Sequence, residues 1–231
     1  MVEALLDLDL ADEPGAASAG SATAGADPTN PARRGVIDRT DHALAVASRP
    51  QRTSLRGVVL HRIGDAADAP VAEGRDVEGI IHFFTHDPVG VATVTVNGSW
   101  ESKVPLIEKW RTEGIPDNNR VRAFVPYTFL IDPQGVISQM LPLQAVGAHA
   151  PGYNESGIGV AFIGDFRSEA PSAEQIESGI AVCVALLRQH HLTPQTVKLL
   201  GHDEVRRIAK QCPGQNFPLD EICRRVAARF S

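Results

Sequence analysis

The segment GHDEVRRIAKQCPGQNF, residues 201–217, combines His202, Lys210 and Cys212 in a stretch bounded by glycine and proline. A thiol that serves packing normally lies on an apolar face, whereas Cys212 has polar residues and Pro-Gly as its neighbours. Thiolate and imidazole together are a ligand combination typical of zinc. Two ligands do not make a metal site, so another part of the chain must supply a third.

His61 is a candidate for that third ligand. It lies near the end of a β-rich apolar segment, GVVLHRI (57–63), and His202 follows a second apolar segment, TVKLLG (196–201). Sites in open α/β sheets gather at the carboxyl ends of strands, so both histidines could enter one cleft. With Cys212 they would leave a fourth position for water, as in catalytic zinc sites. Spacing alone leaves another explanation open, because the chain has eight histidines and these could be unrelated core and surface residues.

The segments around these residues alternate between strand and helix patterns. Apolar runs rich in β-branched residues predict buried strands, and apolar residues at helical spacing predict helices. The pattern therefore predicts an α/β domain in which helices cover a central sheet. We expect strands over 57–63, 89–96 (followed by an Asn97-Gly98 turn), 126–132, 135–141, 157–166 and 196–201, and helices over 76–86, 103–114, 172–187 and 219–230.

The other cysteines differ from Cys212 in their setting. Cys183 and Cys223 each fall on the apolar stripe of an expected helix, so we expect both in the core. The helix that carries Cys183 begins with a predicted capping box formed by Ser172 and Gln175. Three cysteines are too few and too scattered for a disulfide framework. Cys212 is therefore the cysteine whose position suggests chemistry.

Composition divides the 231 residues near position 35. Residues 1–34 are acidic and rich in Ala and Gly, which predicts a disordered tail, and residues 35–231 are expected to form one domain. Residues 1–32 contain six acidic residues and no Lys or Arg, which accounts for the formal net charge of -6. The remainder is near neutral and lacks the basic footprint of a nucleic-acid binder. No apolar run approaches the length of about 18 residues that predicts a membrane span.

Four segments in chain order carry a further signal. They are VVLHRIG, VPYTFLIDPQGVISQ, VGAHAPGYNESGIGVAFIGDF and GHDEV…KQCPG. Together, over about residues 55–223, they resemble the zinc N-acetylmuramoyl-L-alanine amidases that share a fold with peptidoglycan recognition proteins and phage endolysin amidases. The resemblance implies an α/β fold with a central mixed β-sheet flanked by helices. It also implies one Zn²⁺ per chain and a peptidoglycan or muropeptide substrate.

The resemblance assigns roles to five residues. His61, His202 and Cys212 correspond to the metal ligands, and Tyr127 and Lys210 correspond to the catalytic residues. The phenol of Tyr127 could hydrogen-bond the attacking water or the oxyanion, and the ammonium of Lys210 could stabilise the oxyanion. The alternatives are a tyrosine that only packs on the sheet and a lysine that is only solvated.

The resemblance also matches two further residues, and this chain differs from family members in two respects. His149 and Asn154 match a segment that lines the family's substrate cleft, although Asn154 could instead stabilise a loop. The muropeptide-recycling branch of the fold carries a Glu where this chain has Ala161, which places the chain with the Tyr/Lys branch. Residues 65–122 match the family poorly, and we expect them to set which glycan or stem peptide is accepted.

The expected activity is hydrolysis of the amide bond between N-acetylmuramic acid and L-alanine. A catalytically silent peptidoglycan-binding protein and a zinc peptidase acting on other peptides are the alternatives. The segment MVEALLDLDLADEPG lacks a positive n-region and an apolar h-region, so we expect no signal peptide. The protein would then be made in the cytoplasm and reach the cell wall through phage lysis or specialised secretion. Any delivery or immunity partner is unidentified.

Overall fold

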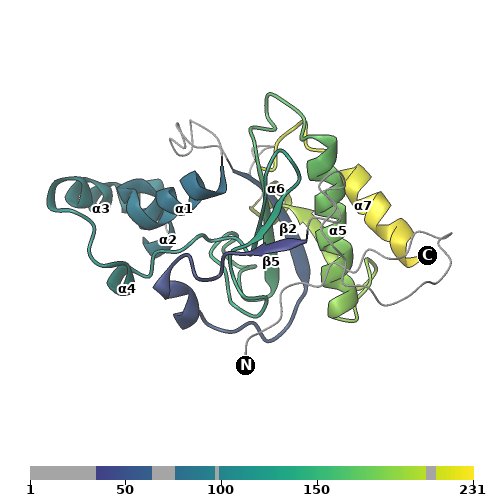
Figure 1. The fold of residues 1–231 in the computed structure, drawn as a ribbon, viewed down its shortest axis with the longest axis horizontal. Coiled ribbons are helices and arrows are strands. Elements are labelled where there is room, and N and C mark those ends of the chain that lie inside the picture. The colour runs from purple at the N-terminus through teal and green to yellow at the C-terminus, as the bar shows by residue number, and fades with distance from the viewer. Residues whose placement is uncertain (1–34, 64–75, 97–98, 207–211) are drawn as a thin grey trace.

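The chain forms a mixed β-sheet with helices on both faces in this computed structural model (Figure 1). The expected tail at 1–34, the Asn97-Gly98 turn and Lys210 lie outside the described residues. The structure describes residues 35–63, 76–96, 99–206 and 212–231.

The sheet has the order β1-β4-β3-β5-β2-β6. Strands β3 and β4 pair antiparallel, as the predicted hairpin requires, and the remaining neighbours pair parallel. This mixture confirms the expected fold class. The strands are β1 (Val36–Asp38), β2 (Gly57–Ile63), β3 (Phe129–Ile131), β4 (Ile137–Gln139), β5 (Gly157–Ile163) and β6 (Lys198–Gly201).

The helices divide between the two faces of the sheet. Figure 1 shows α1, α2 and α3 on one side of the strands and α5 and α7 on the other. The short helix α6 follows directly on β6. The helices are α1 (Val77–His86), α2 (Pro88–Val96), α3 (Trp100–Glu113), α4 (Asn118–Val121), α5 (Ala173–Gln189), α6 (His202–Arg206) and α7 (Leu219–Ala227), with 3-10 turns η2 (Leu44–Ser48) and η3 (Ala228–Phe230).

Every residue of the adjacent strands β2 and β5 is buried, which explains why their sequences are continuous apolar runs. Alternate side chains enter different cores because the side-chain period of a strand is two. Leu60 packs with α5 and α7, whereas Ile63 packs with the α1–α2 side. His61 has the same parity as Ile63, so its ring points to the α1–α2 side of the sheet.

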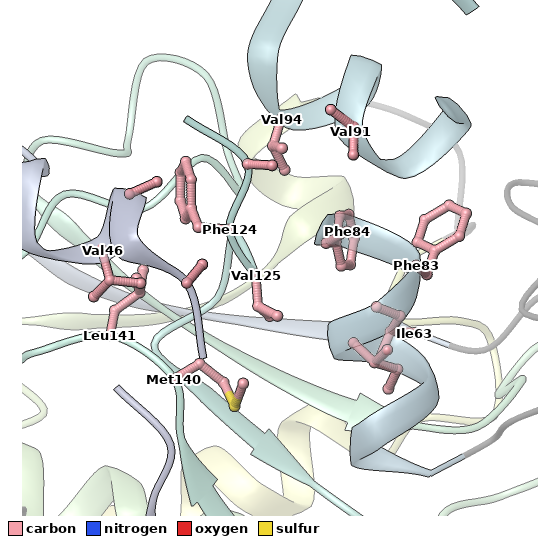
Figure 2. Packing of buried hydrophobic residues seen from close by; sticks show 14 of the residues in the cluster. Val46, Ile63, Phe83, Phe84, Val91, Val94, Phe124, Val125, Met140 and Leu141 are labelled. Atoms are coloured by element: carbon pink, nitrogen blue, oxygen red, sulfur yellow. The ribbon is translucent and has the colours of Figure 1, made fainter. Parts of the chain in front are cut away.

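The core on that side joins the sheet to the helices that precede β3 (Figure 2). Phe83 and Phe84 of α1 are buried there, with Val91 and Val94 of α2 beside them. Ile63, at the end of β2, belongs to the same cluster. Helices from the region that we expected to set substrate choice, residues 65–122, thus share a core with the strand that carries His61.

Residues 88–96 form helix α2, so the expectation of a strand there is wrong. The helix begins as helices commonly do: Oδ1 of Asp87 accepts a hydrogen bond of 2.7 Å from the amide of Val89, and Pro88 is the first helical residue. The helix contacts both α1 and α3 and buries side chains around much of its circumference. Tertiary burial therefore overrides the strand preference of its β-branched residues.

The other local predictions agree more closely with the structure. The Ser172–Gln175 capping box is present with both of its hydrogen bonds. The expected helix at 103–114 is α3, which starts earlier and ends before Gly114, a residue with φ of 84°. Cys183 is fully buried as expected, whereas Cys223 is only partly buried.

Candidate metal centre

The parallel pairing of β2 with β6 brings His61 and His202 together. The register of the two strands places Leu60 beside Gly201. His61 is the next residue of β2, and His202 is the first residue of α6, directly after β6. Their ring centroids lie 4.5 Å apart. The structure thus places both histidines at the carboxyl ends of neighbouring strands, as the sequence suggested.

Cys212 reaches the same place through a tightly packed segment. Its carbonyl oxygen accepts a hydrogen bond of 2.7 Å from the amide of Asp203 at the start of α6. Gly214 has a φ of 116°, and a Cβ there would come within 2.5 Å of the backbone of Phe166, so only glycine fits. The amide of Arg62 donates a hydrogen bond of 3.4 Å to Sγ of Cys212. These contacts hold the sulfur beside the end of β2.

In the described part of the chain, His61, His202 and Cys212 form one group of potential metal ligands. Their ligand atoms all lie within 4.8 Å of one another. Nδ1 of His61 lies 3.7 Å from Sγ of Cys212. A tetrahedral zinc ion with bonds of about 2.0 Å to nitrogen and about 2.3 Å to sulfur separates such atoms by about 3.5 Å. The distance between Nδ1 of His61 and Sγ of Cys212 therefore suits a zinc ion bound to both.

A second observation tests whether a metal fits. Nε2 of His202 is buried and has no hydrogen-bond partner among the described residues. A buried ring nitrogen without a partner is costly, because it has lost its contact with water and gained nothing in exchange. The ring of His202 thus carries an unsatisfied nitrogen beside the other candidate ligands, as expected of a site that a bound ligand completes.

Burial also sets the protonation state of the histidines. Desolvation, reinforced by His149 and His202, lowers the pKa of His61 well below 6.5. Desolvation lowers the pKa of His149 to about 3, and desolvation together with Arg206 lowers the pKa of His202 to about 4. The rings are therefore neutral near pH 7, and neutral imidazole is the form that binds a metal.

The ring nitrogen of His61 that faces away from Cys212 contacts a second histidine, His149. Its Nε2 lies 3.1 Å from Nδ1 of His149, and Nε2 of His149 lies 3.4 Å from the carbonyl oxygen of Gly157. His61 and His149 are both buried, at 1% and 6% exposure. A line of contacts thus runs from the carbonyl of Gly157 through two imidazole rings to the candidate metal position.

Tyr127 lies against the same group of residues. Its ring centroid is 5.0 Å from that of His61 and 6.5 Å from that of His149. On its other side Tyr127 contacts Phe84 of α1, at 6.4 Å between centroids. The structure therefore brings Tyr127 to the candidate metal ligands. Lys210 lies outside the described residues, so its catalytic role stays a prediction.

The expected substrate-binding residues are engaged with the protein itself. Asn154 is 6% exposed, and its Oδ1 accepts hydrogen bonds from the amides of His149 and Ala150, at 3.0 and 2.8 Å. This is the loop-stabilising arrangement that the sequence left open for Asn154. A role for His149 and Asn154 in substrate binding stays a prediction.

Sequence reasoning missed the backbone groups of the site. The amide of Arg62 and the carbonyl of Gly157 belong to the main chain, and no side-chain motif identifies them. The glycines of GIG (157–159) are the feature of the sequence that could have indicated this site, because a glycine inside a strand often marks a place where another group approaches the backbone closely. A Cβ on Gly159 would come within 2.7 Å of Cγ of His149.

The fold and the site together define a class of protein. Two histidines and a cysteine converge at the carboxyl end of a mixed sheet, and three protein ligands are the number found in catalytic zinc sites. The sequence profile of the N-acetylmuramoyl-L-alanine amidase family (Amidase_2) matches residues 51–215, which include all three residues. The chain belongs to this family.

Individual relatives agree with this assignment. Peptidoglycan-recognition protein LB of Drosophila melanogaster is 33% identical over 90 residues, which are 39% of this chain and 38% of that protein. An N-acetylmuramoyl-L-alanine amidase of Mus musculus is 31% identical over 96 residues, which are 39% of this chain and 17% of that protein. The chain thus matches well under half the length of either relative. The solved structure of wild-type Drosophila PGRP-LB has the same fold, with 21% identity, a TM-score of 0.52 and coverage of 81% of this chain and 91% of that one.

Proposed function

We propose that the protein is a zinc-dependent amidase that hydrolyses the bond between N-acetylmuramic acid and L-alanine in peptidoglycan. One observation carries the proposal: Nδ1 of His61 and Sγ of Cys212 lie 3.7 Å apart, and Nε2 of His202 is buried nearby without a partner among the described residues. Family membership supports peptidoglycan as the polymer that is bound or cut. The name of the mouse relative supports the choice of bond.

The chain's own residues would divide the chemistry as follows. A zinc ion held by His61, His202 and Cys212 would supply Lewis acidity and a water whose pKa is lowered to about 7. The phenol of Tyr127, whose ring lies against His61, would hydrogen-bond the attacking water or the oxyanion and orient it. The ammonium of Lys210, two positions before Cys212 in the chain, would stabilise the oxyanion.

Substrate binding and the site of action belong to the same proposal. The peptide stem or the muramyl sugar would lie against the segment that carries His149 and Asn154. The protein would act on the cell wall after lysis or specialised secretion. No helix among the described residues is long and apolar enough to cross a membrane.

A protein that binds peptidoglycan without cutting it is the second candidate. It is favoured by the peptidoglycan-recognition proteins among the relatives. It is opposed by the grouping of His61, His202 and Cys212, because binding alone does not require three metal ligands.

Mass spectrometry of digested peptidoglycan separates these possibilities. We expect the zinc-loaded protein to release sugar-free stem peptides with a free L-alanine amine, and Cys212→Ala to release none. Cleavage of stem peptides that lack the sugar would indicate a zinc peptidase instead. If several types of peptidoglycan stay intact although zinc is bound, the binding protein is the correct assignment.

A further inference from the structure

We infer that His149 is a positioning residue for the metal site: it accepts the Nε2 proton of His61 and so leaves the lone pair of Nδ1 facing the metal position. This inference rests on the proposed metal site and adds a role for a residue that we had expected to contact substrate. This role does not require His149 to touch the substrate or the metal.

The contact with Gly157 determines which nitrogen of His149 carries the proton. Its carbonyl oxygen can only accept a hydrogen bond, so the proton between it and His149 belongs to Nε2 of the histidine, at 3.4 Å. A neutral imidazole carries one proton, which leaves Nδ1 of His149 as an acceptor. Nδ1 of His149 lies 3.1 Å from Nε2 of His61, so Nε2 of His61 must be the donor. The remaining nitrogen of His61, Nδ1, then has a free lone pair.

The contact of His61 with Cys212 requires the same protonation pattern. Nδ1 of His61 lies 3.7 Å from Sγ of Cys212, so it is the nitrogen on the metal side. A ligating nitrogen carries no proton, which puts the proton of His61 on Nε2, toward His149. The backbone carbonyl and the metal position thus require the same tautomers of both rings.

The surroundings of His149 fix the plane of its ring. Gly159 and Gly147 flank it so closely that a Cβ on either would come within 2.7 and 2.9 Å of ring atoms. Asn154 holds the backbone amide of His149 at 3.0 Å. Arg52 donates a hydrogen bond of 2.7 Å to the carbonyl of Gly157, which keeps this acceptor in place. A ring held in this way can impose its orientation on His61.

Two nearly isosteric variants test the inference. His149→Leu removes the acceptor, whereas His149→Asn retains an oxygen close to the position of Nδ1. Removal of a hydrogen bond to a metal-ligating histidine typically weakens metal binding by about 10–100-fold. We expect a loss of this size for His149→Leu in zinc competition with a chelator, a clearly smaller loss for His149→Asn, and no change for His82→Leu, an exposed histidine on α1.

The tautomer can be observed directly in the zinc-free protein by ¹⁵N NMR of the histidine rings. We expect the Nε2–H tautomer of His61 in the wild type and a mixture of tautomers in His149→Leu, a change that altered packing alone would not produce. An Nδ1–H tautomer of His61 in the wild type would overturn the inference, as would wild-type zinc affinity in His149→Leu. If His149→Leu does not fold, the wild-type spectrum and His149→Asn still decide. Failure of the wild type to bind zinc would instead overturn the proposed function.

Discussion

Nδ1 of His61 lies 3.7 Å from Sγ of Cys212, although 151 positions separate the two residues in the chain. The contact joins the end of β2 to the segment that follows α6, and the amide of Arg62 hydrogen-bonds the same sulfur. The candidate metal site is therefore assembled by the pairing of distant elements, and it depends on the fold in ways that mutations can test.

Loss of the cysteine ligand should remove the metal. A ligand that binds only the folded state raises the unfolding temperature by mass action, so zinc should stabilise the wild type against heat. In Cys212→Ser we expect this zinc-dependent shift to disappear, as measured by differential scanning calorimetry with and without a chelator. Cys223→Ser is the matched control, because that partly buried thiol lies outside the site. An unchanged zinc-dependent shift in Cys212→Ser would show that this cysteine is not a ligand.

Tyr127 and Lys210 should affect turnover and leave zinc binding intact. Tyr127→Phe removes only a hydroxyl, and we expect kcat to fall by about 10²–10⁴-fold. Lys210→Met removes the oxyanion-stabilising charge, and we expect a fall of about 10²–10³-fold. Steady-state hydrolysis of a muropeptide measures both, with Lys198→Met, an exposed residue at the start of β6, as the control. Wild-type kcat in either variant would mean that the side chain only packs or is only solvated.

Asn154 should stabilise the loop through its side-chain oxygen. Asn154→Leu would leave two buried amides, those of His149 and Ala150, without an acceptor. We expect it to lower the free energy of unfolding by about 1–3 kcal/mol in urea denaturation. Asn154→Asp keeps an oxygen at this position and should be milder. If Asn154→Asp keeps its stability but loses affinity for muropeptides, the side chain of Asn154 contributes to substrate binding, which is the role that the family resemblance implied.

His42 should make stability depend on pH away from the metal site. Burial lowers its pKa, and its Nε2 accepts a hydrogen bond of 2.9 Å from the amide of Val125. Because the folded pKa is below the unfolded value of about 6.5, the unfolded state binds the proton first as pH falls. The contribution of His42 to the free energy of unfolding is therefore fully present above pH 6.5. It is lost below that pH, by at most about 1.4 kcal/mol per pH unit. Denaturant unfolding at pH 7.5 and 5.5 should show a smaller decline in His42→Gln than in the wild type, and an equal decline would contradict this.

Local sequence signals predicted most of the elements correctly because their causes are local. The Ser172–Gln175 capping box and the helix stop at Gly114 depend on a few neighbouring residues. The apolar run of β5 reflects burial on both faces, which any central strand of such a sheet would share. Helix α2 was mispredicted because its β-branched residues favour a strand, and only packing against α1 and α3 decides otherwise.

The candidate site also has features that the sequence predicted and features that it did not. Residue types suggested His61, His202 and Cys212 as ligand candidates, and the resemblance of the motifs to the amidase family implied the same three. The sequence also placed both histidines at strand ends. It contained no information about the β2–β6 register, which sets their 4.5 Å ring separation.

Only the tertiary structure decided which nitrogen of His61 faces the cysteine and which faces His149. That choice depends on the carbonyl of Gly157 and on the space left by Gly159, and both belong to the backbone of β5. The sequence specifies the identity of each side chain, so the types of ligand could be predicted from it. Orientation depends on main-chain groups that every residue shares, and these gain a specific role only when the strands are paired.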